Sequence, residues 1–414
     1  MIAADVTDAA AAAATAVAPA TDLRVRSSRT EPGRLSTEPG RLSTELAWLS
    51  TEAAVRPSAE AAGLAMEPAV RLSAEAAGLA RRRPKRLRPG SRVAVVAPSG
   101  RNDADLVAAG CAVLTGWGLE VEVAPHALAS HPDLSYLAGN DTGRAADLQQ
   151  AWLDPRIEAV VCARGGYGAQ RIADQLDWTA MAEVPPKIFT GFSDITALHE
   201  AFALRLGVTT LHAPNIGAAS FVQFPEAQES LRRALFEPDR LVLSPGDTHC
   251  LVSGRSAGLT AGGNLSLLVA GLGTADSRQP ATSGRTQPAA SAGSQPAASA
   301  GGQPAVSGGG FAGCILLLED VREECYRLDR MLTQLLRSGA LDGVAGVALG
   351  TWTECGEPEA VRQVMQDRLG GLGVPVVWGM GFGHIAPQPT VPLGVPAELD
   401  ADNGTLTFLE PAVA

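Results

Sequence analysis

Several features that would place the chain in a special class are missing from its 414 residues. No apolar stretch approaches the roughly 20 residues that a bilayer-spanning helix needs. Positive charge is in deficit, with 33 Lys and Arg against 44 Asp and Glu and a formal net charge of −11. This balance argues against a chain-wide role in binding nucleic acid or a membrane surface, because the main basic run, at 81–88, is local. We therefore expect a protein that binds neither nucleic acid nor membrane.

Cysteine is scarce and scattered. None of the six cysteines forms a CxxC pair, so neither a disulfide framework nor a thiolate zinc site is indicated, and we expect reduced, buried thiols. The first 20 residues are rich in alanine but carry Asp5 and Asp8 and no basic segment, unlike a secretory signal. These features predict a cytoplasmic protein.

Two segments have a composition unlike the rest of the chain. The first contains short duplications, such as EPGRLST at 31–37 and again at 38–44, that lack the pattern of a solenoid unit. We expect residues 1–85 to form a disordered or weakly helical extension. Between 275 and 310, QPA recurs in sequence rich in Gly, Ser and Ala, which predicts a flexible insertion. The remaining sequence is ordinary globular sequence, enough for one large or two moderate domains.

Short apolar runs alternate with amphipathic segments through this remaining sequence. The alternation indicates βαβ units and a parallel sheet covered by helices on both faces. We expect an N-terminal α/β domain over 86–220 and a second α/β domain over 221–414, interrupted by the insertion at 275–310. The expected strands are 92–98, 119–123, 157–162, 187–190, 208–211, 314–318, 344–349, 374–377 and 405–409, and the expected helices are 103–117, 141–153, 168–176, 194–206, 326–337 and 358–369.

The most specific local signal is KIFTGFSDIT at 187–196. A strand runs into a glycine and then Ser193, and an amphipathic helix follows. Such a turn lifts the serine hydroxyl clear of the sheet edge and places it at a helix N-terminus. The segment resembles the GxSxG nucleophile elbow, although Ile195 stands where that motif has its last glycine. Ser193 is therefore a candidate nucleophile, and the alternative is that Ser193 or Asp194 caps the helix.

A serine nucleophile needs a base and a group that orients the base. Among the six histidines, His384 stands out because it lies in a Gly- and Pro-rich loop after a strand, where loops build sites. The alternative is an exposed loop histidine. His199 would be carried away from the serine turn by its helix. The candidate orienting carboxylate is Glu319, directly after the apolar run 314–318, whereas its neighbour Asp320 could cap a turn.

Two glycine clusters complete the set. RGGYG at 164–168 follows a strand and could offer backbone amides to an oxyanion, beside the amide of Asp194. The run has no GxGxxG spacing and no GKS or GKT, so nucleotide binding is only weakly indicated. GGN at 262–264 predicts a tight turn and the start of a helix.

These segments together resemble the LD-carboxypeptidases, a serine peptidase family that includes muramoyltetrapeptide carboxypeptidases and the microcin C self-immunity peptidase. The resemblance runs in family order over nearly all of 86–414, and the extension and the QPA insertion depart from it. The matching segments are VAVVAPSG at 93–100, ARGGYGAQRI at 163–172, FTGFSDITALH at 189–199, GGNLSLL at 262–268, ILLLEDVREECYRLDRMLTQL at 315–335 and GFGHIAPQPTVPLG at 381–394.

The resemblance implies a flavodoxin-like N-terminal domain and a smaller α/β C-terminal domain, with the site between them, usually in a homodimer. It implies a triad of Ser193, Glu319 and His384, without metal or cofactor. The implied oxyanion donors are the amides of Asp194 and of the turn at Gly165 and Gly166. The implied reaction cleaves the bond between the L-centre of the diamino acid and the terminal D-Ala of murein tetrapeptide, during cytoplasmic peptidoglycan recycling.

Two other functions stay open. A hydrolase of peptidyl or aminoacyl nucleotides would need an aromatic side chain that stacks on a base, for which Trp352 is the candidate, although such a residue is more often packed. A non-catalytic muropeptide-binding module would have no reason to keep a serine turn, a strand-end Glu and a loop His together. The candidate substrate-binding residues are Arg164, Asn264 and Trp352. Arg322 and Arg327, like Arg164, could pair with substrate carboxylates or form surface ion pairs.

Overall fold

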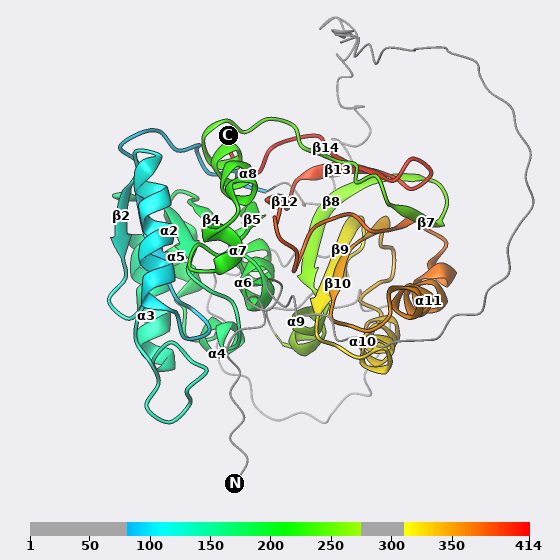
Figure 1. Cartoon of the computed structure of the whole chain (residues 1–414), viewed down its shortest axis with the longest axis horizontal. Helices are drawn as coiled ribbons and strands as arrows, with labels where there is room; N and C mark the ends of the chain where they lie inside the picture. Colours follow the sequence, from blue (N-terminus) through cyan, green and yellow to red (C-terminus); the bar gives the residue numbers. More distant parts are fainter. Residues whose placement is uncertain (1–80, 275–309) are drawn as a thin grey trace, which may run out of the picture. The chain divides into compact units, whose positions relative to one another are not determined.

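The structure is a computed structural model that describes residues 81–274 and 310–414. The expected disorder of 1–85 and the expected flexible insertion at 275–310 therefore fall almost entirely outside the described residues. The described chain forms two β-sheets with helices packed on them (Figure 1). This mixed α/β architecture confirms the predicted fold class.

The first sheet has six strands in the order β12-β5-β4-β3-β1-β2. Strands β1 to β5 are parallel, and their order 2-1-3-4-5 is that of flavodoxin-like folds. Strand β12 is antiparallel to β5. The strands are β1 (Arg92–Val96), β2 (Glu120–Val123), β3 (Ile157–Cys162), β4 (Ile188–Gly191), β5 (Thr210–His212) and β12 (Val391–Leu393).

Both faces of this sheet are buried, as a parallel sheet requires. Along β1, Val93 and Val95 pack with α2, α7 and α8, whereas Ala94 and Val96 pack with α3 to α6 on the opposite face. The helical elements are α2 (Ala104–Gly116), α3 (Asp141–Leu153), α4 (Ala169–Ala173), α5 (Trp178–Glu183), the 3-10 turn η1 (Ser193–Ile195), α6 (Thr196–Ala201), the π-helical turn η2 (Phe202–Leu206), α7 (Ala219–Val222) and α8 (Pro225–Phe236).

The second sheet has eight strands in the order β6-β14-β13-β8-β9-β10-β11-β7. Its centre, β8 to β11, is parallel. Helices α9, α10 and α11 pack on one face, and the other face joins the core of the first sheet. The elements are β6 (Val242–Leu243), β7 (His249–Val252), β8 (Arg255–Asn264), α9 (Leu265–Gly271), β9 (Cys314–Val321), α10 (Cys325–Ser338), β10 (Gly346–Thr353), α11 (Pro358–Leu369), η3 (Gly370–Leu372), β11 (Val376–Trp378), β13 (Pro396–Asp400) and β14 (Thr405–Phe408).

Strand β12 links the two sheets. It pairs with β5, and the carbonyl of its Pro392 accepts a hydrogen bond from Oγ1 of Thr260 in β8 at 2.9 Å. Figure 1 shows β12 between β5 and β8. Because the sheets are joined here, a residue that follows β4 of the first sheet can meet two residues from the second sheet, one inside β9 and one after β11.

Two local expectations were wrong. The helix predicted to start after GGN at 262–264 is confirmed, because Asn264 caps α9, but Gly262 and Gly263 lie at the end of β8 rather than in a tight turn. A Cβ at Gly263 would lie 2.6 Å from Oγ1 of Thr196, so glycine allows β8 to approach α6. Glu319 lies inside β9, not after it, because β9 continues to Val321 beside β8 and β10.

The described chain is ordered before residue 86. Arg82 forms a bridge with Val208, and its guanidinium donates to the carbonyls of Ala182 and Val184. Leu87 is fully buried in the core of the first sheet.

Across 81–274 and 310–414, no helix has both the length and the apolar character needed to cross a membrane.

Candidate active site

Ser193 occupies a strained turn at the carboxyl end of β4. Its φ is 64°, in the left-handed region that L-residues other than glycine rarely adopt. The turn is compact, as Gly191 shows: a Cβ at this position would lie only 2.9 Å from Cγ2 of Ile195. A strained serine between a buried strand and a helix is the local geometry of a nucleophile elbow.

His384 joins Ser193 to Glu319. Its Nε2 lies 3.1 Å from Oγ of Ser193, and its Nδ1 lies 2.6 Å from Oε2 of Glu319. The backbone amide of His384 also donates to that Oε2 at 3.1 Å, and the hydroxyl of Thr353 in β10 donates to the carbonyl of His384. The structure thus brings the three sequence-predicted residues together in the order serine, histidine, carboxylate.

The charges in this group are strongly coupled. Burial opposes protonation of His384, but the neighbouring Glu319 carboxylate outweighs burial by its charge and hydrogen bond, so the pKa of His384 is raised. Burial acts to raise the pKa of Glu319, and the charge and hydrogen bond of His384 reverse the effect, so that this pKa is lowered. The pair therefore favours an imidazolium beside a carboxylate, the charge state that forms when a histidine takes a proton from serine.

Asp194 does not cap its own helix. Its carboxylate accepts a hydrogen bond from the hydroxyl of Ser99, at 2.6 Å, and another from the amide of Ala169 at the start of α4, at 2.7 Å. It thereby connects the serine turn to the loops after β1 and β3. Burial raises the pKa of Asp194. Ser99 was not singled out in the sequence, although its place after β1, at the carboxyl edge of a parallel sheet, is a usable signal.

The turn at Gly165 lies directly against Ser193. A Cβ at Gly165 would lie 2.9 Å from Cβ and 3.3 Å from Oγ of Ser193. The amide of Gly100 donates to the carbonyl of Gly165 at 3.0 Å, which ties this turn to the loop after β1. Glycine is required at 165 because any side chain would displace the serine, and this contact places the backbone of the RGGYG loop beside the hydroxyl.

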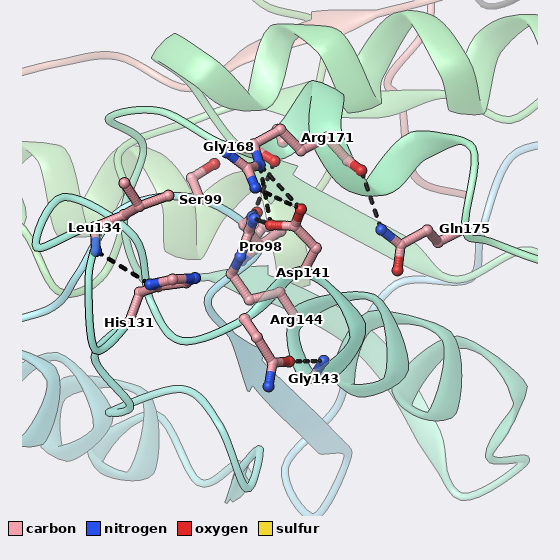
Figure 2. Close-up of polar contacts among 12 residues, drawn as sticks. Pro98, Ser99, His131, Leu134, Asp141, Gly143, Arg144, Gly168, Arg171 and Gln175 are labelled. Carbon is pink, nitrogen blue, oxygen red and sulfur yellow. Dashed lines mark hydrogen bonds and ion pairs between the residues drawn. The ribbon is translucent and has the colours of Figure 1, made fainter.

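Arg144, which the sequence analysis did not identify, connects the loop after β1 to the loop after β3 (Figure 2). Its buried guanidinium donates to the carbonyl of Pro98, to the carbonyl of Gly168 at 2.9 Å, and to Asp141. Arg171 binds the same Asp141 from the exposed side, at 2.8 Å. Because Arg144 is only 1% exposed, it acts on the loops and not on a ligand.

The three candidate substrate-binding residues lie in different environments. Arg164 is exposed on the loop after β3. Asn264 is buried and caps α9; its amide donates to Oδ1 of Asp320 at 3.0 Å. Trp352 is buried and stacks on Trp378, with centroids 6.3 Å apart. Trp352 is therefore a packed residue, which was the alternative to a stacking role, and its ring face is not available to a nucleobase.

The remaining candidates form other contacts. Nε2 of His199 lies 2.8 Å from the carbonyl of Gly191, so His199 points away from the hydroxyl of Ser193, as expected. Arg322 donates to Glu354 at 2.8 Å, and Arg327 lies 3.6 Å from Glu323. Both arginines are therefore surface ion-pair partners. Within the described ranges, no group of three or more His, Cys, Asp or Glu side chains is arranged to hold a metal ion.

Comparisons with known proteins identify the family of this chain. The model of the LD-carboxypeptidase N-terminal domain matches residues 93–213, and that of the LD-carboxypeptidase C-terminal domain matches residues 295–399. A Streptomyces coelicolor protein named as a carboxypeptidase is 54% identical over 332 residues, covering 80% of this chain and 97% of the relative. The murein tetrapeptide carboxypeptidase of Pseudomonas aeruginosa is 31% identical, over 75% of this chain and 94% of the relative.

A solved structure shares the fold. The structure of MccF in complex with glutamyl sulfamoyl guanosine superposes with a TM-score of 0.66 at 20% identity, over 80% of this chain and 99% of that chain. Both halves of the family pattern and nearly the full length of the relatives are thus present. The chain belongs to the LD-carboxypeptidase family and is a serine-type carboxypeptidase.

Proposed function

We propose that this chain is an LD-carboxypeptidase that releases the terminal D-Ala from murein tetrapeptide by a Ser193–His384–Glu319 triad. The observation that carries the proposal is the continuous contact from Oγ of Ser193 to Nε2 of His384, and from Nδ1 to Oε2 of Glu319. The substrate is supported by the similarity to the murein tetrapeptide carboxypeptidase of Pseudomonas aeruginosa.

In the first half of the reaction, Oγ of Ser193 attacks the carbonyl carbon of the diamino acid residue while Nε2 of His384 takes the hydroxyl proton. Glu319 holds the Nδ1–H tautomer and stabilises the imidazolium. The amide of Asp194 and the turn at Gly165 and Gly166 supply the donors for the oxyanion. The bond to D-Ala then breaks, and His384 returns the proton to the leaving amine, which leaves an acyl-enzyme on Ser193.

In the second half, a water molecule attacks the acyl carbon and gives its proton to Nε2 of His384. The tetrahedral intermediate collapses, Ser193 regains the proton, and the shortened peptide leaves with a new carboxylate. Both halves use the same base and the same oxyanion donors, which is why one serine turn and one histidine suffice.

The biological setting is part of the proposal. We place the enzyme in the cytoplasm, as a homodimer, where it acts on murein peptides during peptidoglycan recycling. Cell fractionation and sedimentation of the purified chain test the location and the dimer. An enzyme found outside the cytoplasm, or a monomer with full activity, would overturn these two parts while leaving the chemistry intact.

The test of the chemistry compares the wild type with Ser193→Ala on diaminopimelate-containing murein tetrapeptide, with free D-Ala as the readout and EDTA present in a parallel set. We expect release that requires Ser193 and is unchanged by EDTA. Ser193→Ala removes a hydroxyl without creating a large cavity, so it should keep the fold and bind the peptide. Release by Ser193→Ala at the wild-type rate would remove this serine from the mechanism.

The same assay separates the other two functions. No release by the wild type, together with cleavage of an aminoacyl sulfamoyl or peptidyl nucleotide, would indicate a nucleotide-linked substrate. The packed position of Trp352 leaves that alternative without its expected stacking residue. Binding of muropeptide without turnover of either substrate would indicate a recognition module.

A further inference from the structure

Three loops meet at the proposed oxyanion donors, and one buried side chain connects them. Asp194 directly follows Ser193 and is only 2% exposed. Its Oδ2 accepts from the hydroxyl of Ser99 at 2.6 Å and from the amide of Ala169 at 2.7 Å. Ser99 lies on the loop after β1, and Ala169 begins α4 directly after the RGGYG loop. One carboxylate oxygen therefore joins the serine turn to both neighbouring loops.

The first proposed donor is the backbone amide of Asp194 itself. Asp194 is the second residue of the 3-10 turn η1, and the amides at the start of a helical turn have no acceptor within it. This amide and the carboxylate belong to the same residue, so hydrogen bonds that fix the carboxylate also limit how far the amide can rotate. The side chain thus helps to fix the direction of the first donor.

The second proposed donor is held by the same loop after β1. The amide of Gly100, next to Ser99, donates to the carbonyl of Gly165 at 3.0 Å. The peptide bond between Gly165 and Gly166 is trans, so its N–H points opposite to its carbonyl. The N–H of Gly166 is therefore directed away from the loop after β1, and the hydrogen bonds between described backbone groups include none from this N–H. Adjacent residues of one loop, Ser99 and Gly100, hold both donors.

A second connection between these loops lies one residue earlier on each of them. The buried guanidinium of Arg144 donates to the carbonyls of Pro98 and Gly168, which precede Ser99 and Ala169 (Figure 2). The loops are thus joined twice, once through carbonyls and once through a hydroxyl and an amide. Donors that are fixed before the reaction need no rearrangement when charge develops on the substrate oxygen, which is the condition for strong oxyanion stabilisation.

We propose that the carboxylate of Asp194 is a positioning residue for the oxyanion hole. By binding Ser99 and Ala169, it keeps the two donor amides aimed at one point beside Oγ of Ser193. The inference rests on the proposed triad and oxyanion donors. Its contribution belongs to the transition state, in which the carbonyl oxygen becomes an oxyanion, and not to the bound peptide. Loss of the carboxylate oxygen should therefore lower kcat and leave KM nearly unchanged.

The test compares Asp194→Ala with Asp194→Asn in the full chain. Both hydrogen bonds end on one oxygen, so the amide oxygen of Asn can accept both, whereas Ala accepts neither. Ser99→Ala, which removes only the hydroxyl, covers the case in which Asp194→Ala does not fold. The matched control is Asp147→Ala, because Asp147 in α3 is also buried and accepts two hydrogen bonds, both from His126 at 2.8 Å.

Two readouts separate the chemistry from the choice of substrate. The first is kcat and KM for release of D-Ala from murein tetrapeptide. The second is the rate at which a fluorophosphonate labels Ser193: Oγ attacks phosphorus, fluoride leaves, and His384 takes the serine proton. The phosphoryl oxygen of this probe needs the same amides as the oxyanion does, so labelling tests the donors without a peptide.

We expect Asp194→Ala to lose roughly 100-fold in both kcat and labelling rate, with KM within about twofold of the wild type. Ser99→Ala should lose about tenfold, because the amide of Ala169 still holds the carboxylate. Asp194→Asn should recover most of both rates, and Asp147→Ala should lose stability in urea without losing either rate. Equal rates in Asp194→Asn and Asp194→Ala, or an equal loss of rate in Asp147→Ala, would overturn the proposal.

The outcomes for the proposed function and for Asp194 are distinguishable. If the wild type is labelled but releases no D-Ala, the proposed substrate fails, and the labelling rates still test Asp194. If the wild type is active and Asp194→Ala matches it, only the role of Asp194 fails. If the wild type is neither labelled nor active, the triad fails and the role of Asp194 fails with it.

Discussion

Gly383 lies directly against Glu319: a Cβ at this glycine would lie 2.6 Å from Oε2, and its φ is 108°. Any side chain there would push the carboxylate away from His384. We expect Gly383→Ala to lower kcat by roughly 100-fold or more, since a shift of about 1 Å is enough for such a loss.

The matched control for this substitution is Gly381→Ala. Gly381 also has a positive φ, of 65°, but its Cβ would meet Pro245 at 3.2 Å and no triad atom. Both variants should lose stability in a urea titration, and only Gly383→Ala should lose kcat beyond that. Equal losses of kcat in the two variants would show that the effect is backbone strain alone.

The pH dependence of activity follows from the raised pKa of His384. The base must be neutral to accept the serine proton, so activity is present above its pKa and is lost as the pH falls through that value. Because the Glu319 carboxylate raises this pKa, the acid limb of kcat/KM should have its midpoint above about 6.5, the usual histidine value.

Glu319→Gln provides the opposite shift. Without the carboxylate, burial is left to lower the pKa of His384, so the acid limb should move to lower pH while kcat falls by roughly 10⁴-fold. A limb that stays in place in Glu319→Gln would mean that another group sets it.

Arg144 and Arg171 both bind Asp141, and we expect their replacement to lower the stability by different amounts. Arg144 is buried and clamps the carbonyls of Pro98 and Gly168, whereas Arg171 holds Asp141 from the surface. We expect Arg144→Lys to lower the free energy of unfolding by about 3 kcal/mol, because an ammonium cannot span these acceptors. Arg171→Lys should change it by less than about 1 kcal/mol. Urea titration of both variants measures the difference, and equal values would contradict the clamp.

The strained backbone of Ser193 predicts that two inactive variants differ in stability. Ser193→Gly and Ser193→Ala both lack the hydroxyl and should both be inactive. At a φ of 64°, only glycine is free of the left-handed penalty, so Ser193→Gly should be the more stable of the two by about 1 kcal/mol. Thermal or urea unfolding decides this, and a more stable alanine variant would mean that the turn stores no strain.

Elements with a strong local pattern could be predicted from the sequence, and elements defined by their partners could not. The helices 141–153 and 358–369 and the strand 157–162 agree residue for residue with the structure. Strand β8, RSAGLTAGGN, has too few apolar residues for a period to be seen, and it forms because β9 and β13 pair with it on either side. Strand β12, short and with a central proline, likewise depends on β5.

The site divides in the same way. Ser193, Glu319 and His384 stand in segments with their own sequence signals, and the structure brings them together, although their roles stay proposed. Arg144 gave no such signal, because it looks like an ordinary residue of a helix. Its importance comes from the two loop carbonyls that the fold places next to its guanidinium.

The pairing of β12 with β5 also has a consequence for the order of events during synthesis. The edge of the first sheet beside β5 is completed by residues 391–393, and the candidate base at 384 lies only a few residues before them. A ribosome must therefore translate beyond residue 384 before the candidate serine can meet its candidate base. A chain that stops before residue 384 would carry the strained serine turn without its proposed base, so we expect such a chain to be inactive.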